Sequence, residues 1–164
     1  MITPKNALDA ISAKLIAAFP LDPHIPYLDE VPKDFKRPSS LISCMSVDME
    51  QSSLEGVVVR MTFIVRSFVE VDNYHNADSQ ALYRRGMIQS GLFACGYLPV
   101  SDSDTTPIRE RAMHVELNKQ TFGADYVDTQ LVLSLPVPKN DFAAAESPQP
   151  TMQHLGIHRV LKEE

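Results

Sequence analysis

The segment from Val57 to Val71 constrains the fold more than any other part of this chain. Its odd positions from Val57 to Val65 are apolar, while Arg60, Thr62 and Arg66 fall at even positions. Successive side chains of a strand point to opposite faces, so this alternation predicts a strand with one face on a core. The residues expected to face that core are Val57, Val59, Met61, Phe63 and Val65.

A second apolar run, Ser40 to Met49, comes shortly before the first. It carries apolar residues on both of its faces, a pattern typical of a strand that is covered on both sides. Gln51 to Gly56 has the composition of a turn, so the two runs together predict an antiparallel hairpin. The two faces of the run are Leu41, Ser43, Met45 and Val47 on one side, with Ile42 and Cys44 on the other.

Two helices are expected beside these strands. Thr3 and Pro4 are favoured as the N-cap and first residue of a helix, and Pro20 ends it. A second helix is expected from Asn76 or Asp78 to about Ala94. The apolar stripe of the first is Leu8, Ile11, Leu15, Ala18 and Phe19. That of the second is Ala81, Ile88, Leu92 and Cys95, with Arg84, Arg85 and Gln89 on its solvent side.

The remaining strands are shorter or more polar. Tyr27 to Val31 and Leu98 to Ser101 are expected to be short strands, and Ile108 to Leu117 a longer one. Asn118 to Gly123 then turns the chain back into a last strand, Asp125 to Val137. The positions expected to face inward are Met113, Val115 and Leu117, then Val127, Leu131, Leu133 and Leu135.

These elements predict an α+β fold, a mostly antiparallel sheet of about five to six strands with two helices packed on it. The expected order is helix, three strands, helix, then two or three strands. A chain of 164 residues is long enough for one domain, which we assign to residues 1–137.

From residue 138 to residue 164 the composition changes. Pro148 and Pro150 stand among small and polar residues, and apolar character returns from Leu155 to Leu161. This order predicts a flexible Pro- and Ala-containing arm. Either the arm orders against a neighbouring molecule or it is a frayed terminus.

Charge and cysteine content narrow the function classes. The formal net charge of −6 argues against a protein that binds duplex nucleic acid, because such proteins concentrate Lys and Arg. Cys44 and Cys95 have no partner at metal-ligand spacing, so we expect two small buried hydrophobes in a reduced compartment. The sequence predicts neither a signal peptide nor a membrane span of about 20 apolar residues.

The sequence contains no recognisable catalytic, cofactor or metal site. Carboxylate pairs such as Asp48 and Glu50 fall at strand ends, where solvated acids are common. His154 and His158 have a spacing suited to a metal if helical, but no third ligand is near. Neither a nucleophile motif nor a phosphate-binding glycine loop is present. The chain is therefore expected not to be an enzyme, although residues that meet only in space are invisible at this level.

The segment from Asp29 to Ser40 has an unusual charge arrangement. Glu30 precedes Lys36 and Arg37, which gives neighbouring patches of opposite sign, with Phe35 between them. Such patches suit contact with an identical neighbour in a ring. The alternative is an ordinary loop with solvated charges and Phe35 tucked into the core.

The element order around this segment adds a resemblance. A helix ending in Phe19-Pro20, a short strand with Glu30-Val31, and Phe35-Lys36-Arg37-Pro38-Ser39 feeding an apolar strand are similar to the start of small tail terminator (tail completion) proteins of long-tailed phages and related prophages. The run from Phe63 to Phe68, Asn76 and the helix with Ala81 and Leu82 also resembles that family. The match covers roughly residues 1–135. Ser39-Ser40, where a bulkier pair is expected, and the long C-terminal arm depart from it.

The resemblance implies a homo-oligomeric ring, a hexamer, at the head-proximal end of the tail of a virion assembled in the host cytoplasm. The ring would stop growth of the tail tube and provide a surface for head–tail joining. Its partners would be the tail tube protein, the head–tail connector and, in a contractile tail, the sheath protein. DNA would pass through the lumen without specific binding, and no membrane is involved. The expected subunit contact is Glu30, Phe35, Lys36 and Arg37.

Two other classes stay open. One is another head–tail connector or tail tube component of the same particle. The other is an unrelated soluble binding or enzymatic α+β domain.

Overall fold

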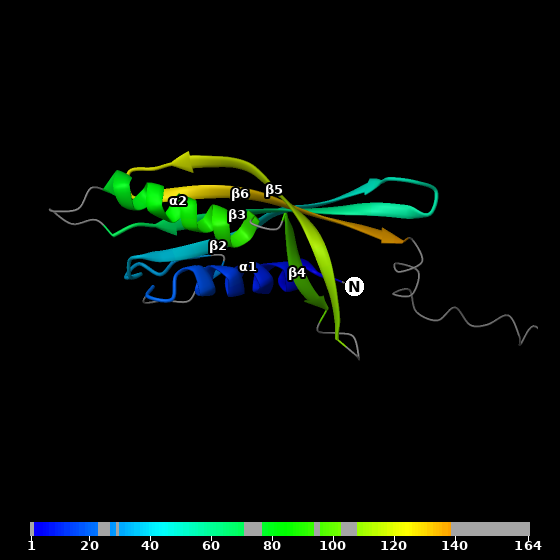
Figure 1. Ribbon diagram of the computed structural model, residues 1–164, viewed down its shortest axis with the longest axis horizontal. Helices are drawn as coiled ribbons and strands as arrows, with labels where there is room; N and C mark the ends of the chain where they lie inside the picture. Colours follow the sequence, from blue (N-terminus) through cyan, green and yellow to red (C-terminus); the bar gives the residue numbers. More distant parts are fainter. Residues whose placement is uncertain are drawn as a thin grey trace, which may run out of the picture.

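Two helices lie on one face of a six-stranded sheet in the computed structural model (Figure 1). The structure describes residues 2–22, 27–28, 30–70, 77–93, 96–102 and 108–138. Its elements are α1 (Pro4–Ala18), β1 (Tyr27–Leu28), β2 (Ser39–Gln51), β3 (Gly56–Phe68), α2 (Ala77–Phe93), β4 (Tyr97–Asp102), β5 (Arg109–Phe122) and β6 (Tyr126–Pro138). The expected α+β class, with two helices and a mostly antiparallel sheet, is confirmed. Three strands follow α2, where two or three were expected.

α1 begins and ends where the sequence predicts. The Thr3 hydroxyl accepts a hydrogen bond from the backbone N–H of Asn6, and the Asn6 side chain accepts one from the backbone N–H of Thr3. This reciprocal cap satisfies two donors that the first turn of a helix leaves free. Phe19 caps the other end, directly before Pro20. The predicted stripe is confirmed, because Ile11, Leu15 and Phe19 are buried and Leu8 and Ala18 pack against the core.

The order of strands in the sheet is β1-β2-β3-β6-β5-β4. β2 and β3 form the expected antiparallel hairpin, and β6 lies between β3 and β5. β1 runs parallel to β2 but pairs with only Leu41 and Ile42. Among the described residues, the rest of β2 therefore has a partner strand on one side only. Figure 1 shows this end of the hairpin projecting beyond both helices.

A bulge in β2 changes which of its side chains share a face. The register with β3 shifts between Cys44 and Ser46, so that Val47 lies opposite Met61 and Met49 opposite Val59. One additional residue in a strand reverses the alternation that follows it. Val47 and Met49 therefore join the face of Ile42, and not the face that the sequence predicted for Val47.

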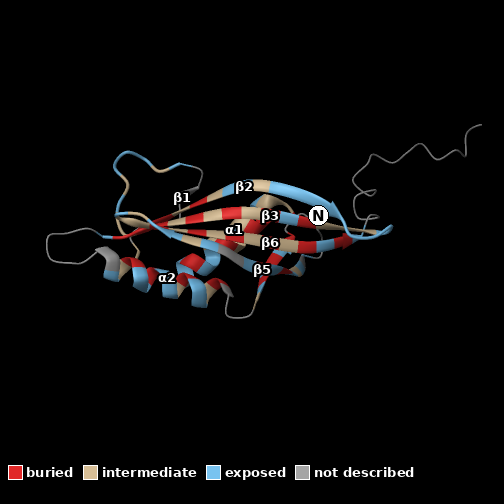
Figure 2. Cartoon of the chain, turned by 90° about the horizontal axis from the view of Figure 1, so that it is seen from above, coloured by how far each residue is buried: buried red, intermediate tan, exposed pale blue. Residues whose placement is uncertain are grey.

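The expectation that this run is covered on both sides is wrong for its second half. Met45, Val47 and Met49 are exposed, and so is Cys44. The buried position expected for Cys44 is likewise wrong. The physical reason is that this half of β2 has a neighbouring strand on one side only within the described part of the chain. Figure 2 shows β2 changing from buried to exposed along its length.

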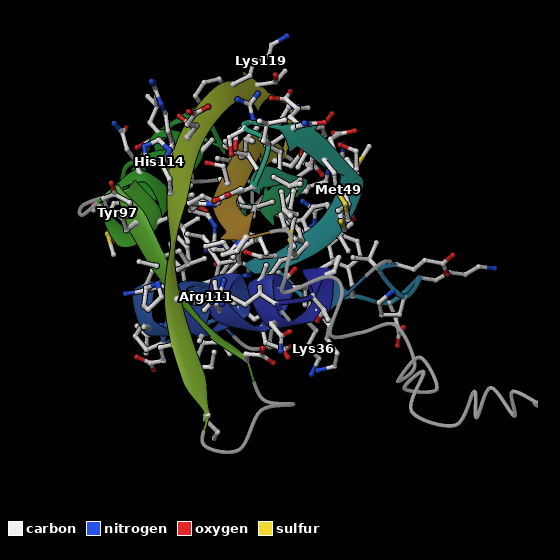
Figure 3. All side chains as sticks on the ribbon, turned by 90° about the vertical axis from the view of Figure 1, so that its right-hand side faces the viewer. Lys36, Met49, Tyr97, Arg111, His114 and Lys119 are labelled. Carbon is white, nitrogen blue, oxygen red and sulfur yellow. The ribbon has the colours of Figure 1, made fainter. Side chains whose placement is uncertain are left out.

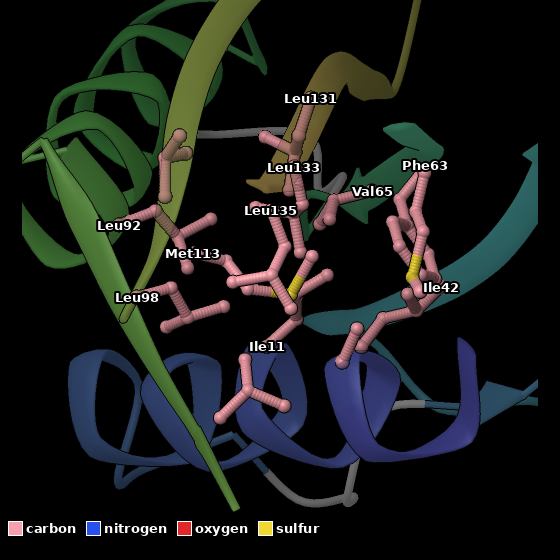
Figure 4. Packing of buried hydrophobic residues seen from close by; sticks show 14 of the residues in the cluster. Ile11, Ile42, Phe63, Val65, Leu92, Leu98, Met113, Leu131, Leu133 and Leu135 are labelled. Atoms are coloured by element: carbon pink, nitrogen blue, oxygen red, sulfur yellow. The ribbon is translucent and has the colours of Figure 1, made fainter. Parts of the chain in front are cut away.

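The core lies between the helices and the facing sides of the strands (Figure 4). Most of the inward positions predicted for β3, β5 and β6 are confirmed, while Val57 is only half-buried. The side chain of Leu117 lies outside the described set. The largest fully buried side chains are Phe63, Ile11, Ile42, Met61, Ile88, Leu98, Met113, Leu131 and Leu133.

β5 is longer than expected, and the predicted turn at Asn118 to Gly123 is wrong. β5 continues past a register shift between Leu117 and Lys119 until Phe122 lies opposite Val127. The bulge takes up the irregularity without ending the ladder. The reversal occurs instead at Gly123 to Asp125, where the Gly123 N–H donates to the Tyr126 carbonyl at 2.9 Å.

Some expectations fall outside the described residues. These are the placements of Asp29, Asn76, Cys95, His154 and His158, and the arm beyond Pro138.

Candidate assembly surface

The segment proposed as a subunit contact is partly used inside its own domain. The ring of Phe35 packs on the ring of Phe68, with centroids 4.6 Å apart. The Arg37 guanidinium lies over both rings, 4.9 Å from the centroid of Phe35 and 5.3 Å from that of Phe68. Cation–π contacts of this length stabilise the arrangement by about 0.5–1 kcal/mol at an exposed site.

Arg37 also joins two separate parts of the chain. It donates to the backbone carbonyls of Val69 and Asp125 at 3.2 Å each. Its guanidinium pairs with the Asp125 carboxylate at 2.6 Å. The structure thus brings Phe35 and Arg37 together as a clamp between the segment, the end of β3 and the β5–β6 turn. Lys36 and Glu30 are exposed, and Figure 3 shows the position of Lys36 on the surface.

A buried polar cluster on α2 is the main feature that the sequence reasoning missed. Arg84, expected on the solvent side, is 5% exposed, so that prediction is wrong. Its guanidinium makes a bidentate pair with the Asp22 carboxylate at 2.7 and 3.0 Å. Its Nε donates to the Ser67 hydroxyl at 2.6 Å, and its charge lies 4.0 Å from the centroid of the Phe19 ring.

The same cluster gives a role to one of the two unexpected serines. The Ser40 hydroxyl lies 3.4 Å from both the Ser67 hydroxyl and the Arg84 guanidinium. A bulkier apolar residue there would displace this network. Ser39 is also buried, and its hydroxyl has no hydrogen-bond partner. Helical spacing does place Arg84 on the buried face of α2, because Arg84 comes three residues after Ala81 and four before Ile88.

The charge of Arg84 is balanced inside the fold, so the cluster is structural. Through it, Arg84 on α2 binds Asp22 in the segment after α1, Ser40 at the start of β2 and Ser67 at the end of β3. A cleft of about 610 Å³ lies beside it. Phe19, Leu21, Pro38, Tyr83 and Met87 are among the residues lining this cleft.

The part of β2 from Met45 to Gln51 has a partner strand on one side only among the residues that the structure describes, and it exposes several apolar side chains. We call it the β2 edge. Met45 is 59% exposed and Met49 61%, and Leu54 in the adjoining turn is 88% exposed. Figure 3 places Met49 on the opposite side of the molecule from Tyr97 and His114. A strand edge of this kind presents free N–H and C=O groups that another strand can pair with.

The opposite edge of the sheet is protected. β4 has only six residues, and Pro99 stands within it. Proline has no backbone N–H, so it interrupts pairing with a further strand. The β2 edge has no proline or glycine, and among the described residues its protection against further pairing is the bulge and the charges of Asp48 and Glu50.

Other charged groups of the sheet are paired within the domain. Arg66 makes two 2.7 Å hydrogen bonds to the Asp128 carboxylate and lies 4.3 Å from the ring centroid of Tyr126. Donation of these hydrogen bonds to Asp128 raises the pKa of Arg66. Glu50 pairs with Arg60 at 3.4 Å, and Asp48 accepts from Ser46 at 2.9 Å.

No group of three or more His, Cys, Asp or Glu side chains suited to a metal occurs in the part of the chain that the structure describes. Within that same part, none of the helices is both long and apolar enough to cross a membrane. Comparison with models of protein families found no match to this chain, and comparison with curated proteins also found none.

Proposed function

We propose that this chain is a structural assembly protein of a phage-type tail. In this proposal it forms a ring that caps the tail tube, stops addition of tube subunits and provides the surface for head–tail joining. The observation that carries the proposal is the β2 edge, which has a partner strand on one side only among the described residues and exposes Met45, Val47 and Met49. When an edge binds a different surface of the next copy, the contact is head-to-tail, and it closes into a ring when the rotation between neighbouring copies closes.

The β2 edge supports self-association for two physical reasons. Its free backbone groups gain hydrogen bonds when another strand adds to it. Its apolar side chains gain about 0.8 kcal/mol for each methylene group that leaves water. Six copies repeat this gain six times in a closed ring, so even a modest contact can hold the assembly.

The resemblance of residues 1–135 to tail terminators supports the particular ring proposed. It assigns the tail tube protein and the head–tail connector as partners, and the sheath protein where the tail contracts. It also assigns the site, the head-proximal end of the tail. A net charge of −6 suits a lumen through which DNA slides without binding. We propose that the protein acts by assembly and not as an enzyme.

Lys36 and Glu30 are exposed charges of opposite sign in the segment from Glu30 to Arg37. We propose that they contribute to the contact between neighbouring subunits. Replacing Lys36 with Glu should weaken the ring and leave the fold intact. Arg37 is not suited to this test, because its hydrogen bond to Val69 and its ion pair with Asp125 stabilise the domain itself. The charge reversal at Lys36 alone therefore separates assembly from folding.

Lysine substitutions on the β2 edge test the proposal directly. Val47→Lys combined with Met49→Lys should convert the ring to smaller species in light scattering, because two charges would have to be buried in the contact. Leu82→Lys on α2 is the matched control, since Leu82 is 56% exposed and lies away from the edge. Loss of the ring in the control as well, or a normal ring in the double variant, would contradict the assignment.

Imaging of particles separates the terminator from other tail components. A terminator forms one ring at the head-proximal end, whereas a tube protein is stacked along the tail. Deleting the gene should give tails of uncontrolled length. Tails of normal length would rule out the terminator function and favour a connector.

A further inference from the structure

The turn between β2 and β3 holds an apolar side chain out into solvent. The backbone N–H groups of Ser52 and Ser53 donate to the Gly56 carbonyl at 3.2 and 3.3 Å. The Glu55 N–H donates to the Ser53 hydroxyl at 3.2 Å. Within this hydrogen-bonded turn, the Leu54 side chain is 88% exposed. A side chain presented on an ordered turn loses less conformational freedom when it binds, so Leu54 is suited to anchor a contact.

The cleft beside Arg84 is an apolar site whose wall carries no unbalanced charge. Its volume of about 610 Å³ equals that of about 20 molecules of liquid water. Leu21 and Tyr83 line it and are 94% and 65% exposed. Arg84 is paired with the Asp22 carboxylate, so an apolar side chain can enter without separating a buried charge from its partner. The cleft can therefore receive a leucine side chain together with part of a turn.

The turn and the cleft lie at opposite ends of the molecule. Figure 1 shows the β2–β3 hairpin projecting at one end of the long axis, while α1 ends and α2 begins at the other. Residues 17–22, which follow the end of α1, and the first half of α2 line the cleft. One copy therefore cannot place its own turn in its own cleft, but a second copy can. Because the two surfaces differ, this contact repeats head-to-tail from copy to copy.

The charges beside the two surfaces are of opposite sign. Glu55 in the turn is exposed, and so is Lys36, two residues before Pro38 in the wall of the cleft. Within the described part of the chain, neither Glu55 nor Lys36 forms an ion pair. Lys33 and Asp34, also exposed in the segment before the cleft, offset each other's charge. This complementarity favours the turn of another copy as the occupant of the cleft and fixes its orientation.

We propose that Leu54 of one copy inserts into the cleft beside Arg84 of the next copy, with Glu55 facing Lys36. This inference rests on the ring proposed above and names a contact that closes it. The turn follows directly after the β2 edge, so this contact continues the one proposed there. Each copy gives one turn and receives one, and the same contact repeats around the whole ring.

Cysteine cross-linking of the full chain tests the insertion. The native thiols are first removed with Cys44→Ser and Cys95→Ala, and Leu54→Cys is then combined with Tyr83→Cys. Both new cysteines replace exposed side chains, so the fold is expected to stay intact. After mild oxidation, non-reducing electrophoresis separates monomers from covalent ladders, and native mass spectrometry reports whether each ring has formed.

Leu82→Cys, used in place of Tyr83→Cys, is the matched control. Leu82 is the neighbouring residue and is 56% exposed, but it lies on the far side of α2 from the cleft. The α2 residues that line the cleft recur at helical spacing and share one face. They are Gln80, Tyr83, Arg84 and Met87.

The expected result is a ladder from dimer to hexamer with Tyr83→Cys and a several-fold lower yield with Leu82→Cys. Mixing a Leu54→Cys chain with a separate Tyr83→Cys chain should also give cross-linked dimers, beyond those that each chain forms alone. This is because the turn and the cleft of one contact belong to different copies.

A charge exchange tests the orientation of the turn. Lys36→Glu should weaken ring formation several-fold, because it faces Glu55 with a like charge. Adding Glu55→Lys to the same chain should restore the ring, since opposite charges then face each other again. The midpoint of urea unfolding should stay the same in both variants, because both positions are exposed. A double variant that assembles no better than Lys36→Glu alone would contradict this placement of the turn.

Three outcomes of the cross-linking would overturn the insertion. They are equal yields with Tyr83→Cys and Leu82→Cys, cross-links only within monomers, and rings of full mass without cross-links. The last leaves the proposed function standing, because the ring then forms by another contact. A monomeric mass for the unmodified chain refutes the ring itself, so the two failures are distinguishable.

Discussion

Replacing Arg84 with methionine removes the charge from the polar cluster between α1, β2, β3 and α2. The change keeps a long apolar side chain on the buried stripe of α2, so packing is largely preserved. It leaves the Asp22 carboxylate without its bidentate partner and the Ser67 hydroxyl without the donor at 2.6 Å. The variant therefore measures what the charge pair contributes to the folded state.

The burial of this pair sets the size of the effect. The Arg84 and Asp22 side chains are only 6% and 11% exposed, so water screens the charge that remains very little. Removing one member of a buried ion pair typically costs about 3–5 kcal/mol. For a chain of this length each kcal/mol lowers the melting temperature by roughly 2–4 °C, which gives a fall of roughly 6–20 °C.

Urea unfolding followed by circular dichroism measures the loss, with all variants compared at one protein concentration. Arg84→Met combined with Asp22→Leu is the matched control, since it removes both charges. The double variant should lose less stability than Arg84→Met alone, because no unpaired charge stays buried. A loss below about 1 kcal/mol in Arg84→Met, or a larger loss in the double variant, would refute the reasoning.

Three further substitutions test other parts of the fold. Phe63→Ala should lower the free energy of unfolding by about 3–5 kcal/mol through the cavity it opens, and a calorimetric loss below 1 kcal/mol would contradict full burial. Arg37→Ala should cost about 1–3 kcal/mol, because it removes the guanidinium that donates to the Val69 carbonyl and pairs with the Asp125 carboxylate; an unchanged midpoint in urea would show that the clamp contributes nothing. Gly96→Ala should cost about 1 kcal/mol, because Gly96 has a φ of +67°; a gain in melting temperature would contradict the left-handed conformation.

The periodicity of apolar residues correctly predicted those helices and strands that have the same neighbours along their whole length. α1 has a cap at Thr3, a stop at Pro20 and an unbroken apolar stripe, and it forms as expected. β3 lies between two strands over its whole length, so its alternation survives unchanged from Val59 to Val65.

The wrong predictions share a physical cause. Each depends on residues that are distant in sequence, and the local sequence pattern carries no information about them. The bulge after Cys44 depends on the register with β3, and it moves Val47 to the other face. Arg84 is buried because Asp22, distant in sequence, neutralises it. The candidate contact could be located from charge alone, but the clamp between Arg37 and Asp125 could not.

The mass of the full-length chain in native solution tests the central claim most directly. A closed hexamer of an 18.3 kDa chain should have a mass of about 110 kDa, six times that of one copy. Native mass spectrometry and light scattering should agree on this value, and electron microscopy should show rings. A strict monomer of 18.3 kDa across the concentrations tested would contradict the account.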